Sequence, residues 1–381
     1  MLSRKSAVSL IKSIRTLRPF APKERIAVAM SGGVDSSLAA AILKKQGFDV
    51  IGVTFRTWPK EECGMSIGRA CCNLEAIVRA RAVAQSLKIP YYVFDFSAEF
   101  KKNVIDYFCG EYIKGLTPNP CIVCNEKIKF AALLEKARSL GAAHIATGHY
   151  AKVSFDKKRG RFLLRDGSDK AKSQSYFLFN LKQEQLAHTI FPLGGMTKDR
   201  VRALAKRYKL KTYNTVSSQD VCFIQDMSYA EYIKKKTGVE IAEGDIVDAG
   251  GKVLGRHKGI PFYTIGQRRG LGVAYSQPLY VTGIDIKNNR IVVGTKKDVL
   301  RKGLIADRLN WVMVDGIDEP MKVSAKIRYG NKKAKATISK ESSDTVKVIF
   351  DEPQEAPTPG QAVVFYDKDM VFGGGWIVRA L

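Results

Sequence analysis

The chain has 381 residues, of which 63 are Lys or Arg and 37 are Asp or Glu, so its formal net charge is +26. This length predicts more than one domain, and a hydrophobic content of 45% is sufficient for buried cores. No stretch approaches 18 uncharged apolar residues, which argues against a membrane-spanning helix. The excess of positive charge favours a polyanionic partner, because phosphate contacts release counterions; a generally basic proteome is the alternative explanation.

The cysteines and the first residues bear on the cellular compartment. The chain has seven cysteines and opens without a signal peptide, which argues against a secreted disulfide framework and favours reduced thiols. Residues 1–23 contain six Lys or Arg and no acid. A mitochondrial targeting segment and a basic arm that contacts nucleic acid both fit this composition. We therefore expect a cytoplasmic protein, with the mitochondrial matrix as the alternative, and we treat 1–22 as an extension.

The first two hundred residues alternate apolar runs with helical periods. Strands are predicted at 25–30, 49–55, 90–96 and 144–150, and helices at 35–47, 73–88, 98–114 and 125–141. The cysteine-containing residues between the last two helices are predicted to form a loop. This βαβα order predicts an α/β doubly wound, mostly parallel sheet with helices on both faces. Ligands of such sheets bind beyond the carboxyl ends of the strands.

From about residue 240 the sequence changes to short alternating runs separated by Gly, Asn and Asp. This pattern predicts antiparallel sheets or small barrels, here a small β-rich central domain followed by a C-terminal β-barrel. Residues 287–289 are a candidate hairpin turn. The basic run 295–303 is a candidate boundary between the two β-rich domains, although a solvated loop explains it equally well.

The segment SGGVDSS, residues 31–37, follows the first predicted strand and opens the first helix. Glycines without a Cβ atom let backbone N–H groups approach an anion, and the helix start adds its positive end. Ser36 and Ser37 add hydroxyl donors, and Asp35 is a candidate ligand for Mg²⁺ between phosphates. The segment is neither GxxxxGK[ST] nor GxGxxG, which excludes both of those nucleotide loops. A tight strand–helix turn with an ordinary N-cap is the structural alternative.

SGGVDSS resembles the pyrophosphate loop of ATPases that split ATP between the α and β phosphates. That group includes amide-forming synthetases, tRNA lysidine synthases and tRNA thiolases. The resemblance implies an adenine nucleotide α-hydrolase-like fold, ATP and Mg²⁺ as cofactors, and an adenylated substrate. The ATP-binding positions that it implies are Ala29, Met30, Ser31, Gly32, Gly33, Val34, Asp35, Ser36, Ser37, Phe55 and Gly148.

Four further segments narrow the resemblance: TPNPCIVCNEKIKF (117–130), ATGHYAK (146–152), SQSYFL (173–178) and SSQDVCFI (217–224). With SGGVDSS they are similar to the bacterial and mitochondrial tRNA-specific 2-thiouridylase family. GQRRGLG, TPGQAVVFYD and FGGGWI match it further, so the resemblance extends from about Arg25 to the C-terminus. It implies ATP-dependent replacement of the O2 oxygen of the wobble uridine, position 34, by sulfur. The expected acceptors are tRNAs for Lys, Glu and Gln.

This reaction requires cysteine thiols that carry and transfer sulfur. A ring carbonyl oxygen is a poor leaving group, transfer of AMP makes it a good one, and a sulfur nucleophile then attacks C2. By the resemblance, the nucleophile is Cys124 and the persulfide carrier is Cys222, and the second thiolate resolves the intermediate as a disulfide. The expected sulfur donor is a cysteine desulfurase, directly or through a relay protein.

The cysteine at position 121 allows a second mechanism of sulfur transfer. Many members of the family have Asp at this position, and those with Cys are linked to an iron–sulfur cluster held by three cysteines. Here these would be Cys121, Cys124 and Cys222, which leave one iron of a [4Fe–4S] cluster open for sulfide. Zinc held by the same thiolates with a water or His149 is a third option. A CxxC packed in a loop without chemistry is the structural alternative.

By the same resemblance, the expected tRNA contacts are Asn119, Pro120, Cys121, Lys172, Ser173, Gln174, Arg328 and Tyr329. The sequence adds Arg268 and Arg269 on a glycine-flanked loop, which suits phosphate contacts, with a solvated loop as the alternative. Asp is common in the family at the position of Ser173. Cys109 is expected in the core, and Cys63, Cys71 and Cys72 are expected to pack at a helix start.

The expected organisation is a catalytic domain at 23–225, a central tRNA-binding domain at 226–298 and a C-terminal barrel at 299–381. Two other functions stay open. One is an amide-forming ATP pyrophosphatase such as an argininosuccinate-type ligase, which needs no thiols near the loop. The other is a non-catalytic protein that binds tRNA or an iron–sulfur cluster.

Overall fold

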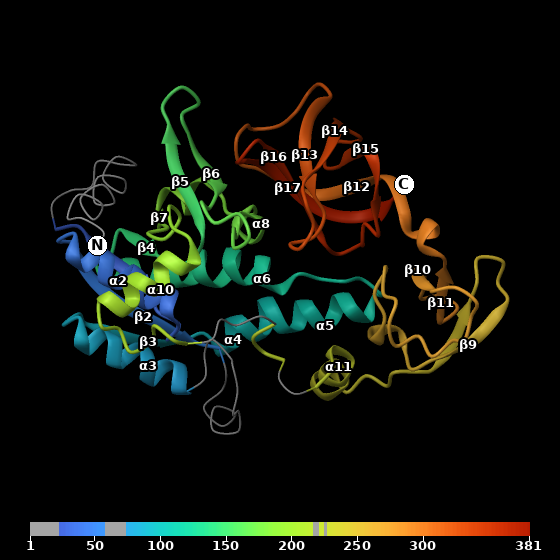
Figure 1. The fold of residues 1–381 in the computed structure, drawn as a ribbon, viewed down its shortest axis with the longest axis horizontal. Helices are drawn as coiled ribbons and strands as arrows, with labels where there is room; N and C mark the ends of the chain where they lie inside the picture. Colours follow the sequence, from blue (N-terminus) through green and yellow to red (C-terminus); the bar gives the residue numbers. More distant parts are fainter. Residues whose placement is uncertain (1–22, 58–73, 216–220, 225–226) are drawn as a thin grey trace.

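The computed structural model describes residues 23–57, 74–215, 221–224 and 227–381. These residues form a five-stranded parallel sheet, a four-stranded sheet and a larger sheet that closes into a barrel, as Figure 1 shows. The predicted α/β sheet, β-rich central domain and C-terminal β-barrel are confirmed. In the described part of the chain, no helix is long and apolar enough to span a membrane.

The parallel sheet has the strand order β3-β2-β1-β4-β7. Its strands are β1 (Arg25–Ala29), β2 (Asp49–Arg56), β3 (Tyr91–Asp95), β4 (His144–Ala146) and β7 (Thr189–Ile190). All four neighbouring pairs are parallel. The chain order reverses between β1 and β4, so the carboxyl ends of these two strands flank a crevice of the kind that binds ligands. β4 ends at Ala146, four residues earlier than predicted, because the chain then turns toward the nucleotide loop.

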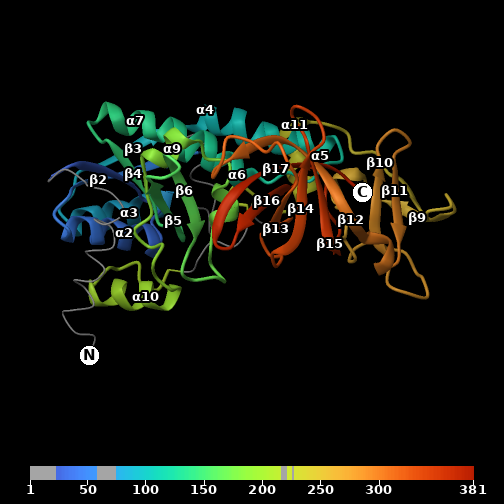
Figure 2. The same ribbon diagram turned by 90° about the horizontal axis from the view of Figure 1, so that it is seen from above.

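Helices cover both faces of this sheet in two layers, which Figure 2 shows on opposite sides of the strands. Val28 packs in one core with α2 (Val34–Lys45), α3 (Leu74–Ser86) and α10 (Lys198–Arg207). The neighbouring Ala27 points to the other core, because side chains alternate along a strand. That second layer contains α4 (Ser97–Phe100), η1 (Lys101–Ile105), α5 (Asp106–Ile113), α6 (Pro120–Val123), η2 (Cys124–Ala132) and α7 (Leu133–Ser139).

The cysteine segment is helical, so the predicted loop is wrong. α6 begins at Pro120, and proline favours the first helical position because its fixed φ suits the helix and its missing N–H has no intrahelical partner there. The chain continues through η2, a π-helical stretch, into α7. The Gln185 side chain donates to the carbonyls of Glu126 and Phe130 at 2.8 and 3.0 Å. These two hydrogen bonds go to backbone carbonyls of η2, whose turn is wider than that of an α-helix.

A hairpin absent from our predictions joins the first domain to the barrel. It consists of β5 (Ala151–Asp156) and β6 (Arg161–Asp166), and it projects beside the barrel in Figure 1. Arg165 of β6 pairs with Met370 at the start of β17 (Met370–Ala380). The hairpin is followed by α8 (Ser175–Leu178) and α9 (Gln183–Ala187).

The central domain follows α11 (Tyr229–Thr237) and has a small core of its own. Its strands are β8 (Gly244–Val247), β9 (Val253–His257), β10 (Tyr280–Asp285) and β11 (Arg290–Gly294), with η3 (Ile260–Phe262) between β9 and β10. The predicted hairpin at 287–289 is confirmed, with Asn289 in the left-handed region at φ 48°. β11 pairs with β8 in parallel, so this sheet is mixed rather than purely antiparallel.

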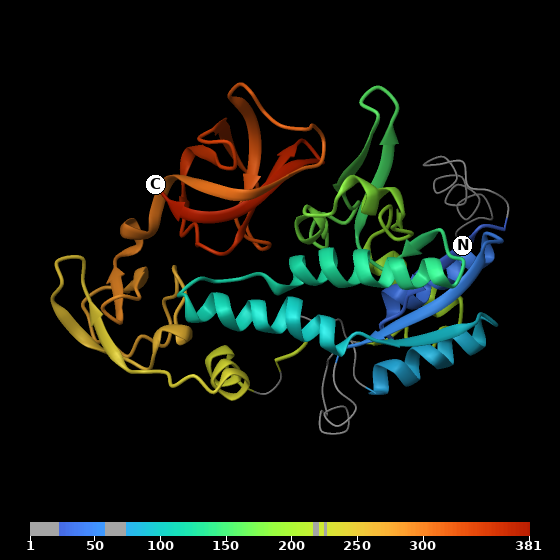
Figure 3. The same ribbon diagram turned by 180° about the vertical axis from the view of Figure 1, so that it is seen from behind.

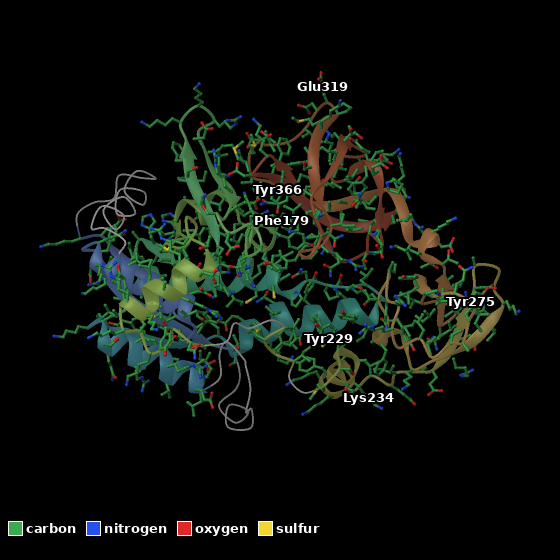
Figure 4. The ribbon with its side chains drawn as sticks, in the orientation of Figure 1. Phe179, Tyr229, Lys234, Tyr275, Glu319 and Tyr366 are labelled. Atoms are coloured by element: carbon green, nitrogen blue, oxygen red, sulfur yellow. The ribbon has the colours of Figure 1, made fainter. Side chains whose placement is uncertain are left out.

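The barrel has six strands: β12 (Leu300–Trp311), β13 (Met321–Lys326), β14 (Ala334–Lys340), β15 (Val346–Glu355), β16 (Ala362–Asp367) and β17. It closes because β12 pairs with both β15 and β17. The basic run 295–303 forms η4 (Lys296–Val299) and the first residues of β12. Phe179 of the first domain and Tyr366 of the barrel share one core at the junction that Figure 4 shows.

Candidate active site

The nucleotide loop, residues 30–33, leaves β1 and enters α2 beside the crevice between β1 and β4. Gly32 adopts φ +70°, and a Cβ atom there would lie 2.4 Å from the carbonyl oxygen of Ala76, so only glycine fits. Gly33 is the N-cap of α2 with an extended backbone. The loop therefore presents its backbone at the positive end of a 12-residue helix, an arrangement that suits a phosphate.

Serine hydroxyls of the first turn of α2 hydrogen-bond to the backbone of the nucleotide loop. Ser36 and Ser37 both donate to the carbonyl of Gly33, at 3.2 and 2.8 Å, and both side chains are buried. The backbone N–H of Ser31 donates to Ser36 Oγ at 3.1 Å. The predicted phosphate donors are thus engaged in fixing the first turn of α2. Ala29, Met30 and Val34 are buried beneath the loop.

Asp35 is held by two donors from distant parts of the chain. The Lys198 ammonium lies 2.8 and 2.6 Å from Oδ1 and Oδ2, and the Tyr150 hydroxyl donates to Oδ1 at 2.7 Å. Burial and the neighbouring Asp35 charge raise the pKa of Tyr150, so its hydroxyl keeps its proton. Both carboxylate oxygens are occupied by protein donors, which does not fit the predicted role as a Mg²⁺ ligand, and we derive no step through that ion.

Lys198, at the start of α10, is a functional candidate that sequence reasoning missed. It places a cation beside the nucleotide loop, 163 residues away from Asp35 along the chain. Its only local signal is the N-cap Thr197, whose hydroxyl accepts from Arg200 N. That signal predicts a helix start and gives no indication of a phosphate site.

The turn after β4 closes the crevice from the other side. A Cβ atom on Gly148 would lie 2.8 Å from backbone and side-chain atoms of Asp35 and Ser36, so this turn touches the start of α2 directly. Tyr150 of the same turn supplies the hydroxyl on Asp35. The predicted ATP position at Gly148 is therefore in contact with the start of α2, next to the nucleotide loop, whereas Phe55, near the end of β2, packs against the other core.

His149 links this turn to the cysteine helix, which is the helical segment 120–139 formed by α6, η2 and α7. Its ring lies 5.9 Å from that of Phe130 in η2 and 5.9 Å from that of Phe191, and its Nδ1 is 2.7 Å from the Thr147 hydroxyl. Burial, with the nearby Lys129 cation, lowers the pKa of His149 well below its ordinary value. The imidazole is therefore a neutral packing group in this structure.

Cys124 lies in the core at the first residue of η2, 8% exposed, and Cys121 is exposed one turn earlier. Cys124 precedes Phe130 by six residues, roughly 9 Å along a helix. The helical segment 120–139 is roughly 30 Å long, whereas the five-residue strand β1 is roughly 17 Å long. Because α7 leads into the amino end of β4, the cysteine end of the segment extends past the carboxyl edge of the sheet. Figure 3 shows it running beside α5 toward the barrel.

Cys222 packs against the same core as Cys124. The neighbouring Phe223 lies 5.8 and 5.2 Å, ring to ring, from Phe100 and Phe108. These two rings belong to α4 and α5, whose layer packs against α6 and η2. The two predicted sulfur-handling residues therefore share one core on one face of the sheet.

Comparison with known proteins decides the family. A model described as the tRNA methyl transferase HUP domain matches residues 24–226, followed by a PRC-barrel domain at 230–295 and an aminomethyltransferase beta-barrel domain at 301–377. The chain is 49% identical to the tRNA-specific 2-thiouridylase MnmA of Clostridioides difficile (strain 630), over 94% of this chain and 99% of that protein. The chain belongs to the tRNA-specific 2-thiouridylase family. Members so named are tRNA sulfurtransferases.

A second relative of the 2-thiouridylase family, MnmA 2 of Thermoanaerobacter sp. (strain X514), is 51% identical over 94% of this chain and 98% of that protein. Among solved structures, the U34-tRNA thiolase NcsA from Methanococcus maripaludis with its [4Fe-4S] cluster is 17% identical. Its TM-score is 0.36, with coverage of 61% of this chain and 71% of that chain. This likeness is too low to support a conclusion about the site.

The thiols of this 2-thiouridylase family member do not form a metal site where they are described. Within the described ranges, no group of three or more His, Cys, Asp or Glu is placed to hold a metal ion, and the described cysteines form no disulfide. Cys121, Cys124 and Cys222 thus do not fit a cluster or zinc in this arrangement, and we derive no step through either. Cys109 is in the core as predicted, and burial, aided by Asp106, raises its pKa to about 11. Cys63, Cys71 and Cys72 lie outside the described residues.

The predicted tRNA contacts of the first domain fall in different environments. Asn119 is the N-cap of α6 and Pro120 is buried beside it. Lys172 is exposed, but Ser173 is 9% exposed and donates to Asp166 at 2.9 Å. Gln174 accepts from the backbone N–H of Tyr150 at 3.0 Å, which ties this segment to the nucleotide side of the site.

Of the predicted tRNA contacts in the other two domains, some are exposed and some are bound to other parts of the protein. Arg268 and Arg269 are exposed on the central domain. The Arg328 guanidinium instead donates to the carbonyls of Ile265 and Ala356 at 2.8 and 3.2 Å and to the Thr358 hydroxyl, so it joins the central domain to the barrel. The neighbouring Tyr329 ring lies 4.5 Å from the ring of Phe177 on α8 and helps to join the barrel to the first domain.

Proposed function

We propose that the protein is an ATP-dependent 2-thiouridylase that replaces the O2 oxygen of uridine 34 in tRNA by sulfur. Family membership supports tRNA thiolation, and the fold supports the use of ATP. One observation carries the proposal further. The turn 147–150 contacts the start of α2, directly after the nucleotide loop, through Gly148 and the cysteine helix through His149, which supports adjacent sites for the two halves of the chemistry.

The first step is adenylation. The phosphates of ATP bind at the backbone of the loop 31–33 and the start of α2, where the Lys198 ammonium adds positive charge. The O2 oxygen of the uridine attacks the α-phosphorus, an O–P bond forms, and the bond to the β-phosphate breaks with release of pyrophosphate. The AMP group turns the ring oxygen into a good leaving group.

The second step is sulfur transfer. The terminal sulfur of a persulfide on Cys222 attacks C2 of the ring, and AMP leaves with the former O2 oxygen. The Cys124 thiolate then attacks the Cys222 sulfur, which releases the thiolated base and forms a disulfide between the two cysteines. An external thiol supplies two electrons to reduce that disulfide, and a cysteine desulfurase or relay protein reloads Cys222.

The remaining predictions belong to the same proposal. The exposed residues Cys121, Lys172, Arg268 and Arg269 are candidate tRNA contacts, because the net charge and their exposure favour phosphate binding. Acceptors specific for Lys, Glu and Gln, the domain limits at 225 and 298 and a cytoplasmic location stay predictions. The [4Fe–4S] alternative stays a prediction that requires another arrangement of the three cysteines than the described one, and iron analysis of anaerobically purified protein tests it.

The experiment combines two readouts in one reaction with ATP, unmodified tRNA and a cysteine desulfurase with cysteine. Pyrophosphate release is expected to require tRNA, and 2-thiouridine is expected in the nucleoside digest. Cys124→Ser and Cys222→Ser should lose thiolation, whereas Cys109→Ser should retain it. Pyrophosphate release that is independent of tRNA would contradict the proposal and favour an amide-forming enzyme.

A further inference from the structure

A turn of the C-terminal barrel holds the backbone just ahead of the cysteine helix. The turn is TPGQ, residues 358–361, between β15 and β16. The backbone N–H of Thr117 donates to the Pro359 carbonyl at 2.9 Å. In the opposite direction, the Gln361 side chain donates to the carbonyls of Thr117 and Pro118 at 2.9 and 3.4 Å. Three backbone groups of residues 117–118 are therefore bound by a turn 244 residues away.

The two segments approach as closely as their backbones allow. Gly360 adopts φ +87°, and a Cβ atom there would lie 2.8 Å from the backbone nitrogen of Thr117 and 3.0 Å from Cβ of Leu116. No L side chain larger than hydrogen fits this position without a shift of one backbone. The contact is thus a direct packing of backbone on backbone, with little room for the 116–118 segment to move.

The turn itself is firmly supported. The N–H of Gly360 donates to the carbonyl of Ile377 at 2.9 Å, and the N–H of Ile377 donates to the carbonyl of Gln361 at 2.8 Å. Arg328 binds the Thr358 hydroxyl, and the same guanidinium binds Ile265 of the central domain. The position of residues 117–118 is therefore set by β17 and by the contact between the barrel and the central domain.

The start of α6 depends on this outside support. Its N-cap Asn119 makes no capping hydrogen bond with its side chain in the described structure, so the usual local device for fixing a helix start is missing. Cys121 and Cys124 follow within the next five residues, so a displacement of 117–118 moves the thiols directly.

We propose that Gln361 is a positioning residue for sulfur transfer: it holds the start of α6 so that the Cys124 sulfur can reach the Cys222 sulfur that is joined to the base. The inference rests on the proposed function of Cys124. The Gln361 side chain hydrogen-bonds to the carbonyls of Thr117 and Pro118, whereas adenylation uses the loop 31–33, so we expect adenylation not to depend on Gln361. A misplacement of about 1 Å at a reacting group costs on the order of 10²-fold in rate.

The test compares Gln361→Met with Arg161→Met. The first keeps the size of the side chain and removes both hydrogen bonds. The second removes the hydrogen bonds that Arg161 of the hairpin donates to the barrel carbonyls of Trp311 and Val312, at 3.3 and 3.2 Å, and its ion pair with Asp315, none of which involves a residue of α6. It therefore controls for weaker docking of the barrel in general. If Gln361→Met does not fold, Gln361→Glu, which also lacks the N–H donors, replaces it.

Two readouts are needed, single-turnover kinetics at saturating ATP and tRNA and hydrogen exchange of the peptide covering 117–124. For Gln361→Met, 2-thiouridine formation should fall about tenfold to a hundredfold, with pyrophosphate release and the KM for tRNA within about threefold of wild type. Exchange at 117–124 should accelerate in this variant and not in Arg161→Met. Unchanged exchange, or an equal loss in both half-reactions, would overturn the positioning role. If the wild type makes no 2-thiouridine, the proposed function fails, whereas the exchange readout still decides whether Gln361 holds the helix start.

Discussion

The nucleotide loop and the cysteine helix differ in how many parts of the chain build them. The loop lies between β1 and α2, which follow one another in the chain, and hydrogen bonds among residues 31–37 fix the first turn of α2. The start of α6 is instead held by a turn of the barrel, and the second predicted thiol, Cys222, reaches its core from another segment. The difference implies that adenylation can survive changes that stop sulfur transfer. Variants that change one region at a time test this difference.

The largest effect is expected for Cys124→Ser, which removes the thiol from an otherwise intact helix. Thiolation should fall on the order of 10³-fold or more, because a hydroxyl is a far weaker nucleophile than a thiolate. Release of pyrophosphate in the presence of tRNA should stay within a few fold of wild type. Both rates are measured on the same reaction mixture, and their parallel loss would show that the two regions are not separable.

A second variant changes the nucleotide-binding part of the site instead of the thiols. In Gly148→Ala the new Cβ atom meets Asp35 and Ser36 at 2.8 Å and displaces the start of α2 from the turn. Adenylation should fall on the order of 10²-fold, with weaker ATP binding by calorimetry. Gly195→Ala is the matched control, because a Cβ atom at Gly195 meets nothing within 4 Å. Equal ATP affinity in the two variants would contradict the contact that links the turn to the loop.

A third change tests how the barrel is attached. Asp166 of β6, with its side chain 8% exposed, accepts from Ser173 and Ser175 and from Lys333 of the barrel at 2.8 Å. Asp166→Asn leaves the half-buried Lys333 ammonium without its counter-charge and should lower the free energy of unfolding by about 2 kcal/mol. Lys170→Ala removes a more exposed, 3.7 Å partner of the same carboxylate and should cost less than about 0.5 kcal/mol. Urea unfolding measures both, and similar losses would mean that the Lys333 pair does not hold the barrel.

The smallest effect concerns His149, which lies between the two regions. Because burial lowers its pKa in the folded protein, the unfolded chain binds a proton below about pH 6.5 that the folded protein does not bind. Stability should therefore fall as the pH decreases from about 6.5, by at most about 1.4 kcal/mol per pH unit from this group. His149→Gln lacks this contribution, so its stability should change less between pH 6.5 and 5.5. Identical slopes for the two proteins would show that folding does not lower the pKa of His149.

The same comparison explains what the sequence could predict. Strand, glycine turn and helix follow one another directly from Arg25 to Lys45, so their periodicity and the glycines place the nucleotide loop without knowledge of the rest. The alternating runs after residue 240 likewise predict β-rich domains. These are local signals, and the structure confirms the elements that they specify.

The parts that the sequence could not predict depend on contacts between distant segments. The sequence predicts a loop between the helices at 98–114 and 125–141, but Pro120 starts a helix that the barrel contacts just ahead of its first residue. Lys198 reaches Asp35 across 163 residues, and Gln361 reaches Thr117 across 244, and neither residue carries a local pattern that reveals its partner. Periodicity reports which face of an element is buried but not which distant element covers it.

The central claim is that one activated nucleotide is passed from the nucleotide loop to the thiols of the adjacent core. The direct test is a rapid-quench single turnover with ATP labelled in the α-phosphate and unmodified tRNA. The account predicts that labelled AMP becomes attached to tRNA and accumulates in Cys222→Ser, which lacks the persulfide that attacks C2, and that it forms on the order of 10²-fold more slowly in Gly148→Ala. Release of pyrophosphate by Cys222→Ser without any labelled tRNA, or formation of 2-thiouridine by this variant at the wild-type rate, would contradict it.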